Sequence, residues 1–124
     1  MILPDEKPLL QRQLIRMADQ RQMNVIFTTG GTGFSERDIT PEATTEVCDR
    51  MAYGRSNAIL YYSLSITPRA MLSRAVSGIR KKTLIINLPG SPKAVKEALE
   101  YILPSLGHGL GILRGTEGEC GKES

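Results

Sequence analysis

The chain has few of the residues from which disulfide frameworks and built-in metal sites are made. Its 124 residues include two cysteines and one histidine, and neither a CxxC nor an HExxH pattern occurs. A structural zinc site needs four such ligands, and small disulfide-rich domains need more cysteines in less chain. The composition therefore argues against both classes. We expect Cys48 to be a buried thiol within a helix.

Long hydrophobic runs and dense charge of one sign are also absent. No stretch is long and apolar enough to span a membrane, and the start, Met1–Asp5, does not have the form of a signal peptide, so we expect a cytoplasmic protein. The net charge is only +3, and aromatic residues are scarce, with no Trp, two Phe and four Tyr. A nucleic-acid binder would interleave basic and aromatic residues in a patch. We therefore expect no nucleic-acid partner and interpret Arg80-Lys81-Lys82 as a solvated turn.

The residues that are present suit one α/β domain. Hydrophobic residues at 40% and charged residues at 23% are ordinary values for a globular protein, and 124 residues suffice for one core. A strand, a glycine-bearing loop and a helix follow one another twice, at 25–50 and 84–103. This alternation predicts a three-layer αβα sandwich with a mostly parallel sheet. The domain should span 1–114, and residues 115–124, rich in Gly, Glu and Lys, should form a disordered tail.

The spacing of apolar residues gives the expected elements. Helices are predicted over 8–23, 40–51, 68–74, 92–103 and 106–113, the last two separated by Pro104. Strands are predicted over 24–28 and 83–88, with 75–79 extended. Residues 57–64 fit a helix or a strand, and a helix is favoured.

A glycine loop follows the first strand and is the strongest local signal. Its residues are Thr28, Thr29, Gly30, Gly31, Thr32 and Gly33. Glycines let the backbone approach a ligand closely, and free amides in such a loop can hold phosphate oxygens, to which the threonines add hydroxyl donors. The loop is not a P-loop, because no Gly-Lys-Ser/Thr follows. A flexible strand-to-helix turn is an equally good interpretation of this run alone.

Two acidic residues precede helix starts. Asp38 can coordinate Mg²⁺ on a nucleotide or act in acid–base chemistry, or it can simply stabilise the helix entrance, for which Thr40 is a cap. Asp5 stands at a cap position ahead of the first helix.

Two further segments can hold an anion. Ser73 and Arg74 can do so, or can merely end a helix. Pro89-Gly90-Ser91 places a turn and a capped helix N-terminus after a strand, which suits either an anion site or a structural connection. We interpret His108 as a surface or packing residue.

Taken together and in order, these motifs resemble the MoaB/Mog family of molybdopterin adenylyltransferases, which includes a domain of gephyrin. The matching runs are Pro4-Asp5-Glu6, Thr28–Phe34, Arg37–Thr44, Met71–Arg74 and Leu84–Pro92. The pairing of TTGGTG with RDxTPEAT is the most specific part of the resemblance, which covers about residues 3–114.

The resemblance implies a nucleotidyltransferase in molybdenum cofactor biosynthesis. The implied reaction transfers the adenylyl group of Mg–ATP to the terminal phosphate of molybdopterin, and the product then receives molybdate. Asp38 and Asp5 match the family's two important acidic positions, with Asp38 assigned to metal and phosphate chemistry and Asp5 to substrate positioning. The glycine loop, Pro89-Gly90-Ser91 and Ser73 would bind substrate. A homotrimer and a downstream molybdate-insertion protein are the implied partners.

The chain departs from the family at its beginning. Family domains open with a strand and a glycine- and serine-rich loop on the nucleotide side of the site, whereas this sequence starts after that unit. We therefore expect a sheet that lacks its first strand, with apolar surface left uncovered. The alternative function is a non-catalytic module of the same fold that binds molybdopterin or serves as an oligomerisation domain, inactive through truncation.

Overall fold

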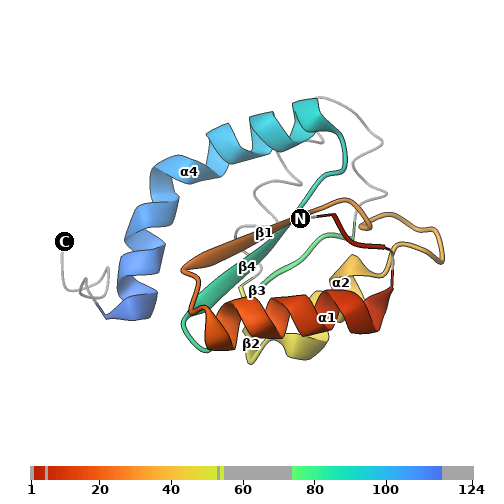
Figure 1. Ribbon diagram of the computed structural model, residues 1–124. Helices are drawn as coiled ribbons and strands as arrows, with labels where there is room; N and C mark the ends of the chain where they lie inside the picture. Colours follow the sequence, from red (N-terminus) through yellow and green to blue (C-terminus); the bar gives the residue numbers. More distant parts are fainter. Residues whose placement is uncertain (1, 5, 53, 55–73, 116–124) are drawn as a thin grey trace.

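The structure, a computed structural model, describes residues 2–4, 6–52, 54 and 74–115 (Figure 1). Its helices are α1 (Lys7–Ile15), a π-helical continuation η1 (Arg16–Gln20), α2 (Thr40–Val47) and α4 (Pro92–Arg114). Its strands are β1 (Val25–Thr29), β2 (Arg50–Met51), β3 (Ser77–Arg80) and β4 (Thr83–Leu88). The predictions for 57–64, 68–73 and 116–124 lie outside the described residues.

The four strands form one mixed sheet in the order β1-β4-β3-β2. β1 runs parallel to β4, with Ile26 opposite Ile85, whereas β4–β3 and β3–β2 are antiparallel. The sheet was expected to be mostly parallel; in the described residues it is mixed, because a two-residue turn joins β3 directly to β4. Lys81, in that turn, has a φ of 54°, the left-handed conformation that such tight hairpins require.

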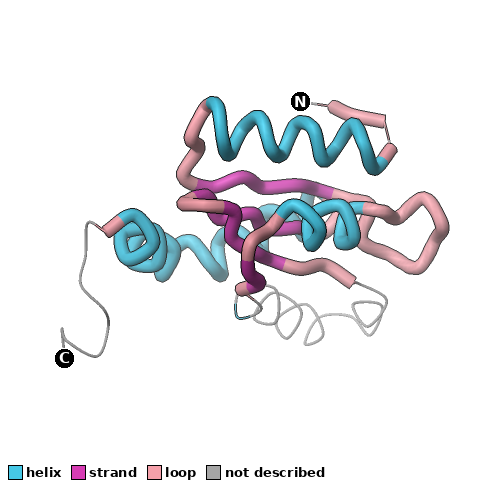
Figure 2. The backbone as a smooth tube through the Cα atoms, turned by 90° about the horizontal axis from the view of Figure 1, so that it is seen from below, coloured by secondary structure: helices cyan, strands magenta, loops and turns pink. Residues whose placement is uncertain are grey.

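Helices cover both faces of the sheet, which confirms the expected three-layer α/β architecture (Figure 2). Along β4 the side chains alternate between two cores. Ile85 packs with Leu14 of α1 and Val47 of α2. Leu84, Ile86 and Leu88 pack on the other face with α4. Every residue of β4 is buried, which explains why its sequence is mostly apolar.

α2 is shorter than the sequence predicted. It ends at Val47 rather than near Met51, because the chain after Cys48 bonds to β3 instead of to the helix. The Asp49 amide donates to Ile79 and the Ala52 amide to Ser77, both at 2.8 Å, and β2 lies between them. The start also differs: Ile39 is the capping residue, and Thr40 is already helical. Cys48 therefore follows the helix, and its partial burial raises the pKa of its thiol to about 11.

α4 is one helix where two were predicted. Pro104 lies inside it, and Figure 1 shows that the helix bends along its length. A proline removes one backbone hydrogen bond and pushes the preceding turn aside, so a bend is the usual result. The helix continues because Ile102 and Leu106, on either side of the proline, bury themselves against the same face of the sheet.

The basic run at the hairpin is only partly a solvated turn. Lys81 and Lys82 are exposed. Arg80 instead donates from Nε and Nη2 to the carboxylate of Asp19, at 3.0 and 2.8 Å, and from Nη1 to the Val47 carbonyl. These hydrogen bonds lower the pKa of Asp19 and tie η1 to β3. None of the helices in the described ranges is long and apolar enough to cross a membrane.

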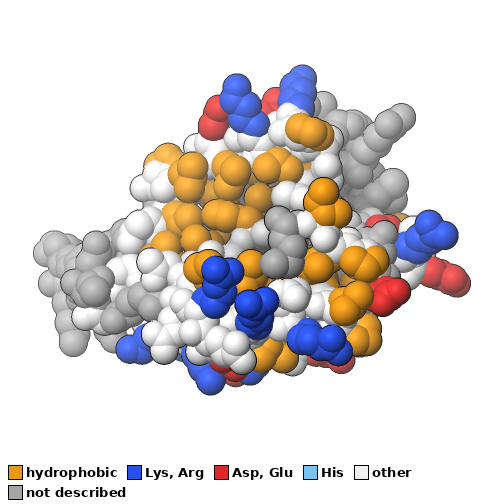
Figure 3. Space-filling model, in the orientation of Figure 1, with side chains coloured by type: hydrophobic (Ala, Val, Ile, Leu, Met, Phe, Trp, Pro, Cys, Tyr) orange, Lys and Arg blue, Asp and Glu red, His pale blue; other side chains and the backbone are white. Residues whose placement is uncertain are grey.

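One edge of the sheet carries no strand within the described residues. β1 pairs only with β4, so its other edge has no ladder partner there. In the view of Figure 3, hydrophobic side chains gather on the surface between α4 and β1. Val25 and Phe27 of β1 are only partly buried in the core that they join there. Within the described residues, this edge of the sheet is therefore unpaired, with apolar surface beside it.

Gly78 offers a test of packing in this sheet. A Cβ at Gly78 would lie 2.6 Å from Cys48 Sγ and 3.1 Å from Met51 Sδ. We expect Gly78→Ala to lower the free energy of unfolding by about 1–3 kcal/mol through overpacking, measured by chemical denaturation. Gly107→Ala is the matched control, since a Cβ there meets nothing within 4 Å. If both variants kept wild-type stability, this packing would be wrong.

Candidate active site

The two glycine-bearing turns lie side by side at the carboxyl ends of β1 and β4. Thr29 is the register partner of Leu88, and the Gly30 amide donates to the Leu88 carbonyl at 3.3 Å. A Cβ added to Gly90 would stand 3.6 Å from Gly30 Cα, so the two turns lie close together. The carboxyl ends of parallel strands are where α/β sheets bind ligands. The structure thus brings together two of the predicted ligand-binding segments.

The glycine loop needs its glycines. Gly30 and Gly31 have φ of 82° and 68°, in the left-handed region that side chains disfavour. At Gly31 a Cβ would also overlap the Thr40 hydroxyl. The Thr40 amide donates to the Gly31 carbonyl at 3.1 Å, which joins the loop to the start of α2. The loop is therefore a built turn, anchored at both ends.

The three threonines of the loop have different surroundings. Thr28 accepts a hydrogen bond from Asn87 Nδ2 through its hydroxyl oxygen, so it faces the interior. Thr32 is buried, and its carbonyl accepts from the Arg74 amide at 2.6 Å. Thr29 alone of the three is exposed. The sequence assigned hydroxyl donors to all three, whereas the structure exposes Thr29, leaves Thr28 partly buried and buries Thr32.

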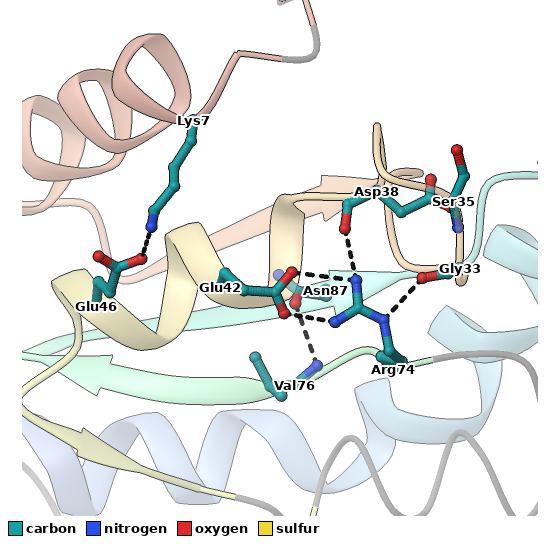
Figure 4. Close-up of polar contacts among 9 residues, drawn as sticks. All are labelled: Lys7, Gly33, Ser35, Asp38, Glu42, Glu46, Arg74, Val76 and Asn87. Atoms are coloured by element: carbon teal, nitrogen blue, oxygen red, sulfur yellow. Dashed lines mark hydrogen bonds and ion pairs between the residues drawn. The ribbon is translucent and has the colours of Figure 1, made fainter.

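Asp38 lies over Gly33 (Figure 4). Its Oδ2 accepts from the Ser35 amide at 2.9 Å, and a Cβ at Gly33 would lie 2.7 Å from the same oxygen. The carboxylate is thus bonded to its own loop rather than to an amide of α2.

Arg74 donates to both ends of this loop and to α2. Its Nε bonds the Gly33 carbonyl at 2.8 Å, and its Nη2 bonds the Asp38 carbonyl at 2.6 Å. Nη1 and Nη2 donate to the two oxygens of the Glu42 carboxylate at 2.5 and 3.1 Å. These bonds lower the pKa of Glu42 and raise that of Arg74. The guanidinium is thus engaged by protein oxygens, which disagrees with its interpretation as an anion holder.

Asn87 is a buried polar residue that the sequence interpretation missed. Its Nδ2 donates to the hydroxyls of Thr28 and Thr44, at 2.9 and 3.0 Å, and its Oδ1 accepts from the Val76 amide at 3.1 Å. Asn87 thereby joins β1, α2 and the segment before β3 directly beneath the two turns. An asparagine inside an otherwise apolar strand was the signal that could have revealed it.

A cavity of about 220 Å³ opens on the α1 side of β1. Its walls include Thr28, Thr29 and Gly30 of the glycine loop and Gln13 of α1. The Gln13 Oε1 atom is buried and has no hydrogen-bond partner among the described residues. Gly90 lies close to the glycine loop, but Pro89, Gly90 and Ser91 do not line this cavity.

Ser91 caps α4 as predicted, its hydroxyl accepting from the Ala94 amide at 3.1 Å. Gly90 and Ser91 are exposed, and Pro89 is partly buried. Asp5 and Ser73, the other two predicted site residues, lie outside the described residues. In the part of the chain that the structure describes, no three His, Cys, Asp or Glu side chains gather into a metal site.

These features define a class of protein: an α/β domain in which two neighbouring glycine turns and a carboxylate lie at the carboxyl ends of two parallel strands. Residues 1–108 match the sequence model of a family described as "probable molybdopterin binding domain". The chain belongs to this family.

Known relatives agree with this assignment. A molybdopterin adenylyltransferase of Helicobacter pylori is 46% identical over 115 residues, which are 93% of this chain and 65% of that protein. Gephyrin of Dictyostelium discoideum is 47% identical over 90% of this chain and 16% of its own length. The crystal structure of the molybdopterin biosynthesis enzyme MoaB of Thermus thermophilus superposes with a TM-score of 0.84 at 47% identity, covering 90% of this chain and 70% of that one. The chain thus spans about two thirds of the length of the bacterial adenylyltransferase.

Proposed function

We propose that this chain carries out adenylyl transfer in molybdenum cofactor biosynthesis. A terminal phosphate oxygen of molybdopterin forms a bond to the α-phosphorus of ATP, and the bond from that phosphorus to the oxygen bridging to the β-phosphate breaks. Pyrophosphate leaves, and adenylyl-molybdopterin remains for molybdate insertion. Such a transfer asks the protein for positioning and charge stabilisation rather than for covalent chemistry.

The proximity of the two glycine turns carries this proposal. The Gly30 amide donates to the Leu88 carbonyl just ahead of the second turn, and Gly90 lies close to Gly30, so the two turns can hold two phosphorylated ligands next to each other. Backbone amides at a glycine turn and at a helix N-terminus are suited to phosphate oxygens. The substrate-binding residues are then Thr28 to Gly33, Pro89 to Ser91, and Ser73, with Thr29 supplying the exposed hydroxyl.

Asp38 is the proposed catalytic and metal-binding residue, and Asp5 the proposed substrate-positioning carboxylate. Mg²⁺ commonly binds through one or two carboxylates together with substrate phosphates, so a lone carboxylate beside phosphate-holding amides fits it. When bound, Mg²⁺ would neutralise charge on the ATP phosphates. Asp38 holds its place through the Ser35 amide, which fixes one carboxylate oxygen.

The proposal extends to assembly and place. The family resemblance favours a homotrimer, which sedimentation of the purified chain would test. The product would pass to a molybdate-insertion protein. A cytoplasmic location is part of the proposal, as expected from the sequence.

The direct test incubates the purified chain with molybdopterin, Mg²⁺ and ATP labelled at the α-phosphate. Labelled adenylyl-molybdopterin and an equal amount of pyrophosphate are expected, and neither without Mg²⁺. If no product formed while molybdopterin still bound, the catalytic proposal would be wrong and a non-catalytic binding module would replace it.

Gly33→Ala provides a second test, because it moves the Asp38 carboxylate without changing its chemistry. The new Cβ would overlap Asp38 Oδ2, and the side chain can escape only by leaving the Ser35 amide. We expect adenylyl transfer to fall about 10- to 100-fold, since a small misplacement of a catalytic group has such effects. Stability should stay close to that of Gly107→Ala. Wild-type activity in Gly33→Ala would separate Asp38 from the chemistry.

A further inference from the structure

Arg74 occupies a central position beside the site. It lies just ahead of β3, and its side chain reaches across the loop that runs from Gly33 to Asp38 as far as Glu42 in the first turn of α2 (Figure 4). Its backbone amide is bonded as well, to the Thr32 carbonyl at 2.6 Å. Arg74 therefore contacts the Thr32 carbonyl just before the loop, the two ends of the loop, and the first turn of the helix that follows.

The pattern of these bonds fixes the span of the loop. The carbonyls of Gly33 and Asp38 point at the same guanidinium, at 2.8 and 2.6 Å, so the distance between the two ends of the loop is set by one rigid group. Inside that span, the Asp38 carboxylate reaches back to the Ser35 amide. The position of the carboxylate over Gly33 thus depends on a loop that Arg74 closes.

Glu42 sets the orientation of the guanidinium. Its two carboxylate oxygens accept from Nη1 and Nη2, the paired geometry that a planar guanidinium forms with a carboxylate. With Glu42 on one side and two carbonyls on the other, the plane of the guanidinium is determined. A lysine has a single ammonium and cannot reproduce this fork.

We propose that Arg74 is a positioning residue that acts on adenylyl transfer through the loop from Gly33 to Asp38. Its guanidinium holds the loop closed, and the closed loop places the Asp38 carboxylate beside the glycine turns. The effect on turnover rests on the proposed function, whereas the effect on the loop does not.

The first arm of the test measures the loop itself in the full chain. Arg74→Lys should speed hydrogen exchange at the amides of Ser35 and Thr40 by about 10-fold or more, because charge-assisted hydrogen bonds that close the loop are lost. Exchange at Ile85 and Ile86 in β4 should stay unchanged. Arg50→Lys, at an exposed arginine of β2, is the matched control. Unchanged exchange at Ser35 and Thr40, or an equal increase throughout the chain, would overturn the proposal.

The second arm measures catalysis. Arg74→Lys should lower kcat about 10-fold or more while changing KM for ATP by less than about 3-fold, because a positioning loss acts on the transition state. Combined with Asp38→Asn, it should add little further loss, since both act through one carboxylate. If the fold-losses of the two single variants multiplied in the double variant, Arg74 would not act through the Asp38 carboxylate, and the proposal would be contradicted. A wild-type chain without transferase activity would refute the proposed function, and the exchange measurements would still decide the loop proposal.

Discussion

Asp38→Asn should lower the rate of adenylyl transfer by about 100- to 1000-fold, the range found when one charge-stabilising group is removed from a preorganised site. The amide of asparagine keeps the shape of the side chain and can still accept from the Ser35 amide, so the loop should persist. What disappears is the negative charge that we assign to Mg²⁺ and the phosphates. The labelled-ATP assay, run over a range of Mg²⁺ concentrations, measures the loss.

Glu36→Gln is the control for this substitution. Glu36 is an exposed carboxylate in the same loop, so its replacement removes the same charge at a short distance. We expect close to wild-type turnover, and both variants should melt within a few degrees of wild type. Equal activity in the two variants would mean that Asp38 contributes only through the overall negative charge of the loop, and not through a specific contact.

Asn87→Leu should have the largest effect on stability. The side chain is fully buried, and leucine has the same branching and number of heavy atoms, although its methyl groups are bulkier. The Val76 amide, however, loses its acceptor, and the hydroxyls of Thr28 and Thr44 lose their donor. A buried polar group left without a partner costs about 1–3 kcal/mol. We expect a loss of about 3 kcal/mol or more, which corresponds to a fall in Tm on the order of 10 °C.

Ile85→Val sets the scale for that measurement. Ile85 is equally buried in the same strand, and removal of one methylene there should cost only about 0.5–1.5 kcal/mol. Chemical denaturation of both variants gives the comparison. If Asn87→Leu were no less stable than Ile85→Val, the hydrogen bonds of Asn87 would be unimportant to the fold.

The local sequence pattern was enough to predict the elements whose structure is determined by residues nearby in the sequence. β4 was predicted with its observed bounds, since an apolar run between Lys82 and Pro89 leaves little choice. Ser91 was identified as a cap for the same reason: the amide that it accepts from lies three residues away. The glycine loop and its place after β1 followed from composition alone.

Features decided by distant contacts were not predictable in this way. β2 has two residues, too few to show any periodicity, and it forms because it pairs with the edge of β3. Pro104 was expected to end a helix, but the core on both sides of it keeps the helix continuous. The role of Arg74 depends on partners 32 to 41 residues away along the chain. No neighbouring residue signals these contacts.

The order of strands in the sheet has a consequence for how the protein reaches its folded state. The hairpin of β3 and β4 is joined by two residues, and such units form within microseconds. β1 must find β4 across nearly half of the chain, since Val25 pairs with Leu84, and contacts between remote segments form slowly. The glycine turns come close together only after that pairing. The surface that we assign to catalysis is therefore assembled late, and substitutions that weaken the meeting of β1 with β4 should delay the gain of activity more than the gain of helix and hairpin.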